Sequence, residues 1–237
     1  MKIRGFFALL WAGLLAAVAA FAGQPVAELY DKAEYRIAMR DSVALYTAVY
    51  TPKAPGEAPV IIFRTPYGCG PYGAGRFPQG FEKGYLRSYV DRGYIIVMQG
   101  VRGRYMSEGD FEHVRPAGSG ETDETTDSYD TVDWLVRHIP HNNGRVGFAG
   151  CSYPGFYAMM GGLCGHPAVK AVSPQAPVTD WFMGDDVHHN GVLMLTDSYR
   201  FLSGMNTPPG HTPTEKMPPM SKRTRPDEWT FFREHAT

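Results

Sequence analysis

The sequence predicts an α/β fold with a mostly parallel, doubly wound sheet. The segments "PVIIFRTPYG" (59–68) and "YIIVMQG" (94–100) are short and continuously apolar, as strands buried on both faces are. Segments with helical spacing, about 10–15 residues long, alternate with such strands. At 145–164 a strand pattern leads through a glycine-containing turn directly into a helix pattern. The ordinary apolar (43%) and charged (20%) content excludes a largely disordered chain.

The elements of the N-terminal half follow in order. Residues 35–51 alternate β-formers around Arg40-Asp41-Ser42, which predicts two strands joined by a tight turn. A strand at 59–65 comes next, then a helix over 80–91, then the strand at 94–100. Nine acidic residues lie between Glu108 and Asp133, and we expect most of them to be solvated.

The next elements complete the alternating pattern. Asp127 or Ser128 is the expected N-cap of a helix that ends near Ile139. "NNG" (142–144) predicts a turn, "RVGFAG" a strand and residues 153–164 a helix. "AVKAVSPQAP" (168–177) predicts a further strand, and the Pro-rich stretch 207–219 predicts a loop.

The N-terminus has the pattern of a signal peptide. Lys2 and Arg4 precede an uncharged apolar run over 5–22, which ends in Ala20-Phe21-Ala22, a small-x-small cleavage site before Gly23. An uncleaved membrane anchor is the rival interpretation, because the run is just long enough to span. We expect an exported protein, periplasmic or secreted, that meets the membrane only during export.

Charge and cysteine content restrict the partners. The formal net charge of −1 gives no reason to expect nucleic acid as a partner. Cys69, Cys151 and Cys164 are an odd number, so at least one thiol stays unpaired unless a second chain joins in. A Cys69–Cys164 disulfide is one pairing that the sequence permits without establishing it. The sequence does not indicate an oligomeric state.

The stretch "GFAGCSYPGF" predicts a nucleophile elbow. The pattern G-x-S-Y-x-G between a strand and a helix is a longer form of G-x-S-x-G, in which a strained turn presents a serine at the helix N-terminus. We interpret Ser152 as the nucleophile and Cys151 as a thiol packed into the core. A structural turn serine and a catalytic Cys151 remain as alternatives.

The residues from about Tyr35 to Ser203 resemble a known family. "FRTPYG", "VRGRYMSEGDF", "DETTDSYDTVDWL", "NNGRVGFAGCSYPGF" and "SPQAPVTDWFMGDD", in this order and spacing, are similar to the X-Pro dipeptidyl-peptidase/CocE/NonD serine hydrolases. The resemblance implies an α/β-hydrolase domain with a helical cap and a C-terminal β-sandwich. It also implies hydrolysis of small-molecule esters, amides or short peptides, including X-Pro peptides, through an acyl-enzyme.

The resemblance also assigns candidate site residues. Ser152 matches the nucleophile, and the oxyanion donors match the backbone N–H of Tyr153 and the hydroxyl of Tyr67. The position of Tyr67, just after a strand, independently favours an oxyanion donor, although a loop aromatic that only packs is the alternative. "MGDDVHHNG" is most similar to the α-amino-acid ester hydrolase and acylase branch, in which a carboxylate matching Asp186 binds the α-ammonium group. A solvated or capping carboxylate is the alternative role.

A metal site and a cofactor are not expected. Asp185 and Asp186, with His188 and His189 nearby, would need more ligands than one helical turn directs to one point. A catalytic triad also needs an acid and a histidine, and in this fold both follow the serine along the chain. None of the later histidines stands in a segment that resembles the family's catalytic one.

We therefore expect the chain to be the front part of a longer hydrolase. Its predicted parts are a signal peptide (1–22), the N-terminal part of an α/β-hydrolase domain (23–178) and the start of a truncated cap (179–237). Without the acid and base, these residues alone would hydrolyse little. A catalytically inactive remnant, or a binding protein that kept the elbow, is the alternative function.

Overall fold

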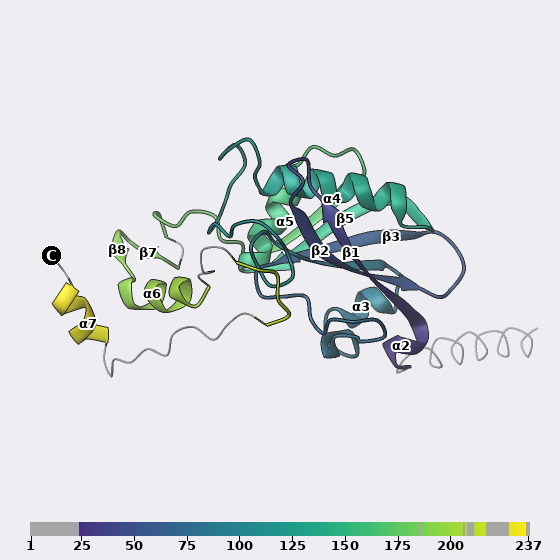
Figure 1. The fold of residues 1–237 in the computed structure, drawn as a ribbon, viewed down its shortest axis with the longest axis horizontal. Coiled ribbons are helices and arrows are strands. Elements are labelled where there is room, and N and C mark those ends of the chain that lie inside the picture. Colours follow the sequence, from purple (N-terminus) through teal and green to yellow (C-terminus); the bar gives the residue numbers. More distant parts are fainter. Residues whose placement is uncertain (1–23, 185, 206, 208–210, 217–227, 236–237) are drawn as a thin grey trace, which may run out of the picture.

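A central sheet of six strands organises the fold in the computed structural model of the protein (Figure 1). The structure describes residues 24–235 except 185, 206, 208–210 and 217–227. The strand order along the sheet is β1-β2-β4-β3-β5-β6. The strands are β1 Tyr30–Ala38, β2 Ala44–Pro52, β3 Ala58–Thr65, β4 Ile95–Gly100, β5 Asn142–Cys151 and β6 Val169–Gln175.

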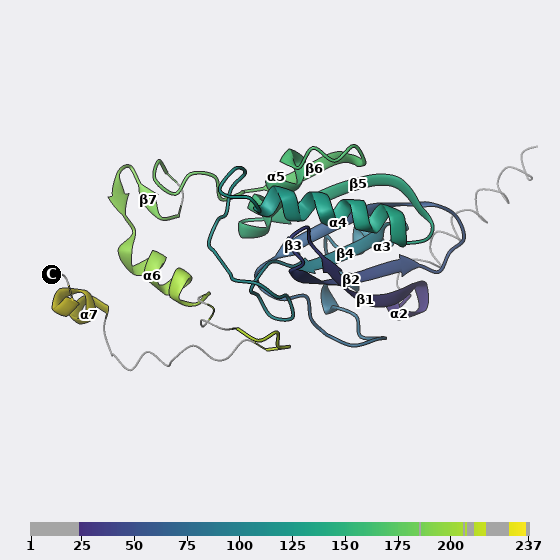
Figure 2. The ribbon, with the colours of Figure 1, turned by 45° about the horizontal axis from the view of Figure 1, so that its top comes forward.

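Helices cover both faces of this sheet. Strands β4, β3, β5 and β6 are parallel, whereas β1 and β2 pair antiparallel with their neighbours. Helices α4 (Glu124–His138) and α5 (Tyr153–Leu163) lie on one face, and α2 (Val26–Leu29) and α3 (Arg87–Val90) lie on the other (Figure 2). The prediction of a mostly parallel, doubly wound α/β fold is confirmed.

The apolar run of β3 follows from this layering. Side chains alternate between the faces of a strand, so a strand covered on both sides needs apolar residues at consecutive positions. Val60 and Ile62 pack on the core that includes α4 and α5. Ile61 and Phe63 pack on the opposite core with α2 and α3. The strand at 94–100 forms as β4 by the same logic.

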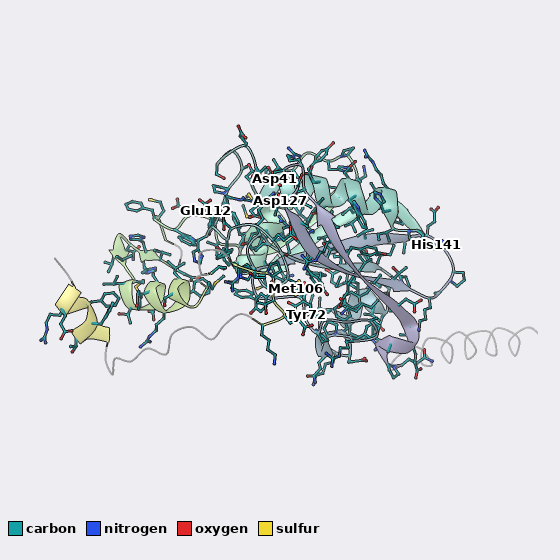
Figure 3. The ribbon with its side chains drawn as sticks, viewed as in Figure 1. Asp41, Tyr72, Met106, Glu112, Asp127 and His141 are labelled. Carbon is teal, nitrogen blue, oxygen red and sulfur yellow. The ribbon has the colours of Figure 1, made fainter. Side chains whose placement is uncertain are left out.

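The predicted hairpin at 35–51 is confirmed as β1 and β2, and its turn is fastened to α4. Arg102 Nη1 donates to Asp41 at 2.6 Å, and Arg102 Nε donates to Asp127 at 2.7 Å. Figure 3 labels both carboxylates, which lie next to each other at this end of the sheet. Asp123, Glu124 and Asp127 are thus buried members of the acidic stretch rather than solvated ones.

The helix predicted over 80–91 is wrong for most of its length. Only the 3-10 turn η1 (Gln79–Phe81) and the four-residue α3 form there. Gly84 adopts φ +81°, a left-handed conformation that interrupts a right-handed helix. The buried side chains of Phe81 and Val90 still pack on the sheet, although no continuous helix joins them.

Helix α4 begins earlier than predicted, because its N-cap is Asp123 and neither Asp127 nor Ser128. The Asp123 carboxylate accepts hydrogen bonds from the backbone N–H groups of Thr125 and Thr126, at 2.8 and 2.9 Å. The Thr126 hydroxyl in turn accepts from the Asp123 N–H, completing a capping box. Asp127 and Ser128 are buried inside the helix, where arginines bind their side chains.

Replacement of Asp123 by alanine should lower the free energy of unfolding by about 1 kcal/mol at neutral pH. Burial alone would raise the pKa of Asp123, but hydrogen bonds from Thr125, Thr126 and Gly118 outweigh it and lower the pKa. A depressed folded-state pKa stabilises above the unfolded value, and that contribution disappears as the pH falls through the folded value. Denaturant unfolding of wild type and Asp123→Ala at neutral and acid pH measures this difference.

The matched control is Asp123→Asn, which keeps an acceptor oxygen without a titratable charge. We expect it to keep the cap to Thr125 and Thr126 but to lose the hydrogen bond from the Gly118 N–H, so its stability at neutral pH should lie between wild type and Asp123→Ala and should not depend on ionisation at this position. Equal stability of Asp123→Ala and wild type at neutral pH would contradict the capping role.

Strand β5 starts three residues before the predicted start, so the turn predicted at 142–144 is wrong. Asn142 pairs with Ala58 of β3, and the ladder is irregular between this pair and Val60. Gly144 has φ +70°. The side-chain oxygens of Asn142 and Asn143 accept from the N–H groups two residues ahead, so turn-type hydrogen bonds persist within the strand. Helix α5 and strand β6 lie where the sequence predicts them.

The three cysteines are free thiols. Cys69 is fully buried, and burial raises the pKa of its thiol to about 12. Cys164 is partly buried near the end of α5. The Cys69–Cys164 disulfide that the sequence permits is therefore not formed in the structure.

The chain after β6 forms small elements outside the sheet (Figure 1). They are the paired strands β7 (His188–His189) and β8 (Val192–Leu193), and helices α6 (Leu195–Ser203) and α7 (Glu228–His235). The predicted boundary at 178 and the start of a cap remain predictions. The predicted signal peptide lies outside the described residues. No described helix is both long enough and apolar enough to span a bilayer.

Candidate active site

Ser152 occupies a strained turn between β5 and α5. Its φ of 62° and ψ of −123° are rare for any residue other than glycine. The backbone is held there because the Ser152 N–H donates to the Gln175 carbonyl at 2.9 Å. The Ser152 carbonyl accepts from the N–H groups of Gly155 and Phe156. The side chain is exposed, so the turn presents the hydroxyl to solvent as an elbow does.

Glycines on both sides make this turn sterically possible. A Cβ atom at Gly150 would lie 2.2 Å from the carbonyl oxygen of Pro154, and one at Gly155 would lie 2.8 Å from the carbonyl oxygen of Gln175. Both distances are to backbone atoms, which cannot move aside as the end of a flexible side chain can. The spacing of the glycines in G-x-S-Y-x-G therefore has a direct steric cause.

Cys151 is exposed, so the prediction of a thiol packed into the core is wrong. Strand alternation places its side chain on the same face as that of Ala149, which is buried. Cys151, however, is the last residue of β5, where the nearby Tyr85 is itself 48% exposed and the side chains of the neighbouring strand β6 are largely exposed. The sheet thus lacks, among the described residues, the cover that would bury this thiol.

Tyr153 is the first residue of α5, so its backbone N–H has no acceptor within the helix and is available beside Ser152. Its ring is completely buried. The phenol oxygen accepts a hydrogen bond from the Val114 N–H at 2.9 Å and lies 3.3 Å from Nδ1 of His113. Burial raises the pKa of the Tyr153 phenol to about 12. The buried ring thus fixes the position of the adjacent backbone N–H.

Tyr67 follows β3, at the edge of the sheet where the parallel strands end. Because β5 is parallel to β3, the ends of both strands lie on the same side, and so do Tyr67 and Ser152. The Tyr67 side chain is 46% exposed. Partial burial raises the pKa of its phenol, the Arg104 guanidinium lowers it, and the Asp186 carboxylate raises it further. Both charged groups therefore lie close enough to act on this hydroxyl.

A cavity of about 550 Å³ opens over Ser152. Its lining includes Ser152, Trp181, Asp186, Asp197 and Phe201, so it combines aromatic walls with two carboxylates. Asp186 is exposed to the cavity, whereas Asp185 lies outside the described residues. The structure thus brings together Ser152 and Asp186. Tyr67 does not line the described part of this cavity, but the charge of Asp186, which does, acts on its hydroxyl.

Comparisons with known proteins identify the family of the chain. The model of the family described as X-Pro dipeptidyl-peptidase (S15 family) matches residues 41–228. The chain belongs to the S15 family. Cocaine esterase from Rhodococcus sp. (strain MB1 Bresler) is 31% identical over 160 residues, which is 67% of this chain and 26% of that esterase.

Two solved structures place the S15 chain among enzymes of this fold. An α-amino acid ester hydrolase is 36% identical, with a TM-score of 0.66 over 74% of this chain and 30% of that protein. An aminopeptidase from a Thaumarchaeota archaeon is 33% identical, with a TM-score of 0.72 over 89% of this chain and 35% of that protein. The S15 chain therefore spans about a quarter to a third of the length of these relatives.

The described part of the S15 chain supplies no hydrogen-bonded base to Ser152. His188 Nδ1 lies 2.7 Å from the Trp181 carbonyl oxygen, and His211 Nε2 lies 3.1 Å from that of Tyr105. His166 is buried beside α4, 3.7 Å from Asp133. His189 lines the cavity, but no hydrogen bond joins it to the Ser152 hydroxyl. The expectation that none of these histidines is the catalytic base stays a prediction.

The sequence analysis missed several residues around the site. Asp197 and Phe201 line the cavity from α6, and their i, i+4 spacing places them on one face of that helix. This spacing was the available signal. Arg104 was missed as well, and nothing in its local sequence distinguishes it from an exposed loop arginine.

Proposed function

We propose that this protein is a serine hydrolase that cleaves esters or amides of acyl or α-amino-acid groups, with Ser152 as nucleophile. The strained, exposed conformation of Ser152 over the cavity is the observation that carries the proposal. The hydroxyl oxygen attacks the substrate carbonyl carbon while a base takes its proton. The leaving group departs with a proton, and water then hydrolyses the acyl-enzyme to regenerate the serine.

The chain also offers groups that stabilise the charge formed in this attack. The carbonyl oxygen of the substrate becomes an oxyanion, which needs preorganised donors. The N–H of Tyr153 at the start of α5 is one candidate, and the helix N-terminus adds a favourable dipole. The hydroxyl of Tyr67 is the second candidate, and its raised pKa keeps it protonated as a donor at neutral pH.

The cavity favours substrates with a cationic group close to the scissile bond. Trp181 and Phe201 give the cavity aromatic surface. The Asp186 carboxylate lines the same cavity as Ser152. An α-ammonium group beside the carbonyl would meet Asp186 when the carbonyl lies at Ser152. The similarity to an α-amino acid ester hydrolase supports this substrate class. Plain carboxylic esters and X-Pro peptides are the other classes within the family.

Replacement of Asp186 by asparagine should raise KM for α-amino-acid esters roughly tenfold, because a charged hydrogen bond to the ammonium group is lost. The matched substrates are the methyl esters of phenylglycine and of phenylacetic acid, which differ only in the α-amino group. Steady-state kinetics of the full-length protein, at a pH where the amine is protonated, measure the effect. The phenylacetic ester should show no change.

The same assay separates the substrate classes. An equal effect of Asp186→Asn on both esters would contradict the ammonium-binding role while leaving Ser152 as nucleophile. Turnover of Xaa-Pro anilides in preference to both esters would favour the peptidase class. Failure of a fluorophosphonate probe to label Ser152 in the active-site peptide would favour the binding protein, because labelling requires an activated serine.

A further inference from the structure

Arg104 carries a buried positive charge that no described carboxylate balances. Arg104 is only 4% exposed, yet its guanidinium donates hydrogen bonds to carbonyl and hydroxyl oxygens only. Two other buried arginines of this region are paired with carboxylates: Arg64 lies 2.9 Å from that of Glu124, and Arg102 lies 2.7 Å from that of Asp127. The Arg104 guanidinium is instead covered by the ring of Phe111, with the cation 4.9 Å from the ring centre.

Such an arrangement costs stability. A buried charge without a counterion is expensive, and neutral acceptors and an aromatic face compensate it only in part. An apolar side chain of similar size would fill the same space without this penalty.

On one side, the guanidinium binds the loop that carries Tyr67, the candidate oxyanion donor. Arg104 Nε donates to the carbonyl oxygen of Pro66 at 2.8 Å, and Pro66 directly precedes Tyr67. The Tyr67 N–H also donates to the Thr65 hydroxyl at 3.1 Å. The peptide that leads into Tyr67 is thus fixed from two sides. The charge of Arg104 also acts on the Tyr67 phenol and lowers its pKa against the effect of burial.

The other side of the guanidinium holds the chain that follows the cavity helix α6. Arg104 Nη1 donates to the Met205 carbonyl oxygen and, at 3.3 Å, to the Thr207 hydroxyl. The Thr207 hydroxyl donates to the Gly103 carbonyl oxygen at 3.0 Å. Helix α6 ends at Ser203 and lines the cavity over Ser152 with Phe201. Arg104 therefore connects one wall of the cavity to the loop of Tyr67.

We propose that Arg104 is a positioning residue that fixes the Tyr67 hydroxyl as an oxyanion donor and ties the Tyr67 loop to the cavity wall formed by α6. The guanidinium does not line the cavity and acts through Tyr67. The proposal rests on the proposed function, because it assigns Arg104 a part in stabilising the oxyanion formed at Ser152.

A double-mutant cycle tests this proposal with the full-length protein and phenylglycine methyl ester. We expect Arg104→Met to lower kcat by roughly 10- to 100-fold with little change in KM, because a displaced donor weakens the transition state and not substrate binding. In a Tyr67→Phe background, the same Arg104→Met substitution should lower kcat less than about threefold, because the group it positions is already gone. Arg104→Lys, which keeps the charge but not the forked geometry, should restore part of the activity.

The controls separate positioning from damage to the fold. Arg76 is exposed, and Arg76→Met should have wild-type kinetics. Thermal unfolding identifies any unfolded fraction, and kcat is referred to folded enzyme. Multiplicative effects of Arg104→Met and Tyr67→Phe, or wild-type kcat in Arg104→Met, would overturn the proposal while Ser152→Ala still abolished activity. Full activity of Ser152→Ala would overturn the proposed function, and the role of Arg104 with it.

Discussion

Replacement of Ser152 by alanine should reduce the hydrolysis of an amino-acid ester by about 10⁴-fold or more. The reason is that the acyl-enzyme cannot form without the hydroxyl oxygen, and only the oxyanion donors and the binding cavity remain. The turn itself should survive, because Ser152 Oγ makes no hydrogen bond to any described residue and the fixed contacts are those of its backbone. Initial rates of the full-length protein, with thermal unfolding as a check of folding, measure the effect.

The matched control is the adjacent thiol. Cys151→Ala changes an exposed side chain at the end of β5 and leaves the elbow backbone unchanged. It should retain at least about half of wild-type activity, because the exposed Cys151 side chain takes no part in the backbone hydrogen bonds that hold the elbow. Loss of activity in Cys151→Ala, with retention in Ser152→Ala, would make the thiol the nucleophile. Because Cys151 is exposed, its thiol is a candidate nucleophile, and the two variants test it against the Ser152 hydroxyl.

Patterns of neighbouring residues were sufficient to predict the elements whose environment is visible in the local sequence. The strand β3 is apolar at consecutive positions because two layers of helices cover it, and that requirement is visible in the sequence. The helix over 80–91 was not predictable in the same way. Its apolar residues pack on the sheet through short turns, and Gly84 at φ +81° decides against a continuous helix.

The start of α4 shows a second limit. Asp123, Asp127 and Ser128 are all good N-cap residues by type, so composition does not choose among them. The choice depends on partners far away in the sequence: Arg102 binds Asp127, and Arg64 binds Ser128 at 3.0 Å. These contacts place both residues inside the helix and leave Asp123 at its end.

The residues of the candidate site also differ in whether the local sequence predicts them. Ser152 was predictable because a strand, a glycine-flanked turn and a helix are adjacent in the sequence. Tyr67 and Asp186 were assigned through a family resemblance. Arg104 was not predictable, since its importance comes from Pro66 and Met205, which lie 38 and 101 residues away along the chain. Such a contact is a property of the folded chain alone.

Replacement of Tyr67 by phenylalanine should lower kcat by roughly 10²- to 10³-fold, the usual effect of removing one oxyanion donor. The ring of Tyr67 is half exposed and packs little, so losing the hydroxyl should leave the free energy of unfolding nearly unchanged. KM should change little, because the hydroxyl is needed for the oxyanion and not for the ground-state carbonyl. Steady-state and pre-steady-state acylation rates of the full-length protein measure the effect.

The pH profile gives an independent check on the same residue. Partial burial raises the pKa of the Tyr67 phenol; Arg104 counteracts this shift and Asp186 adds to it. A phenol donates only while protonated, so a raised pKa keeps Tyr67 active to a higher pH than the ordinary value of about 10 allows. Wild-type activity should therefore not fall through ionisation of Tyr67 below that pH. Tyr67→Phe with unchanged kcat would leave the Tyr153 N–H and the N-terminus of α5 as the groups that stabilise the oxyanion.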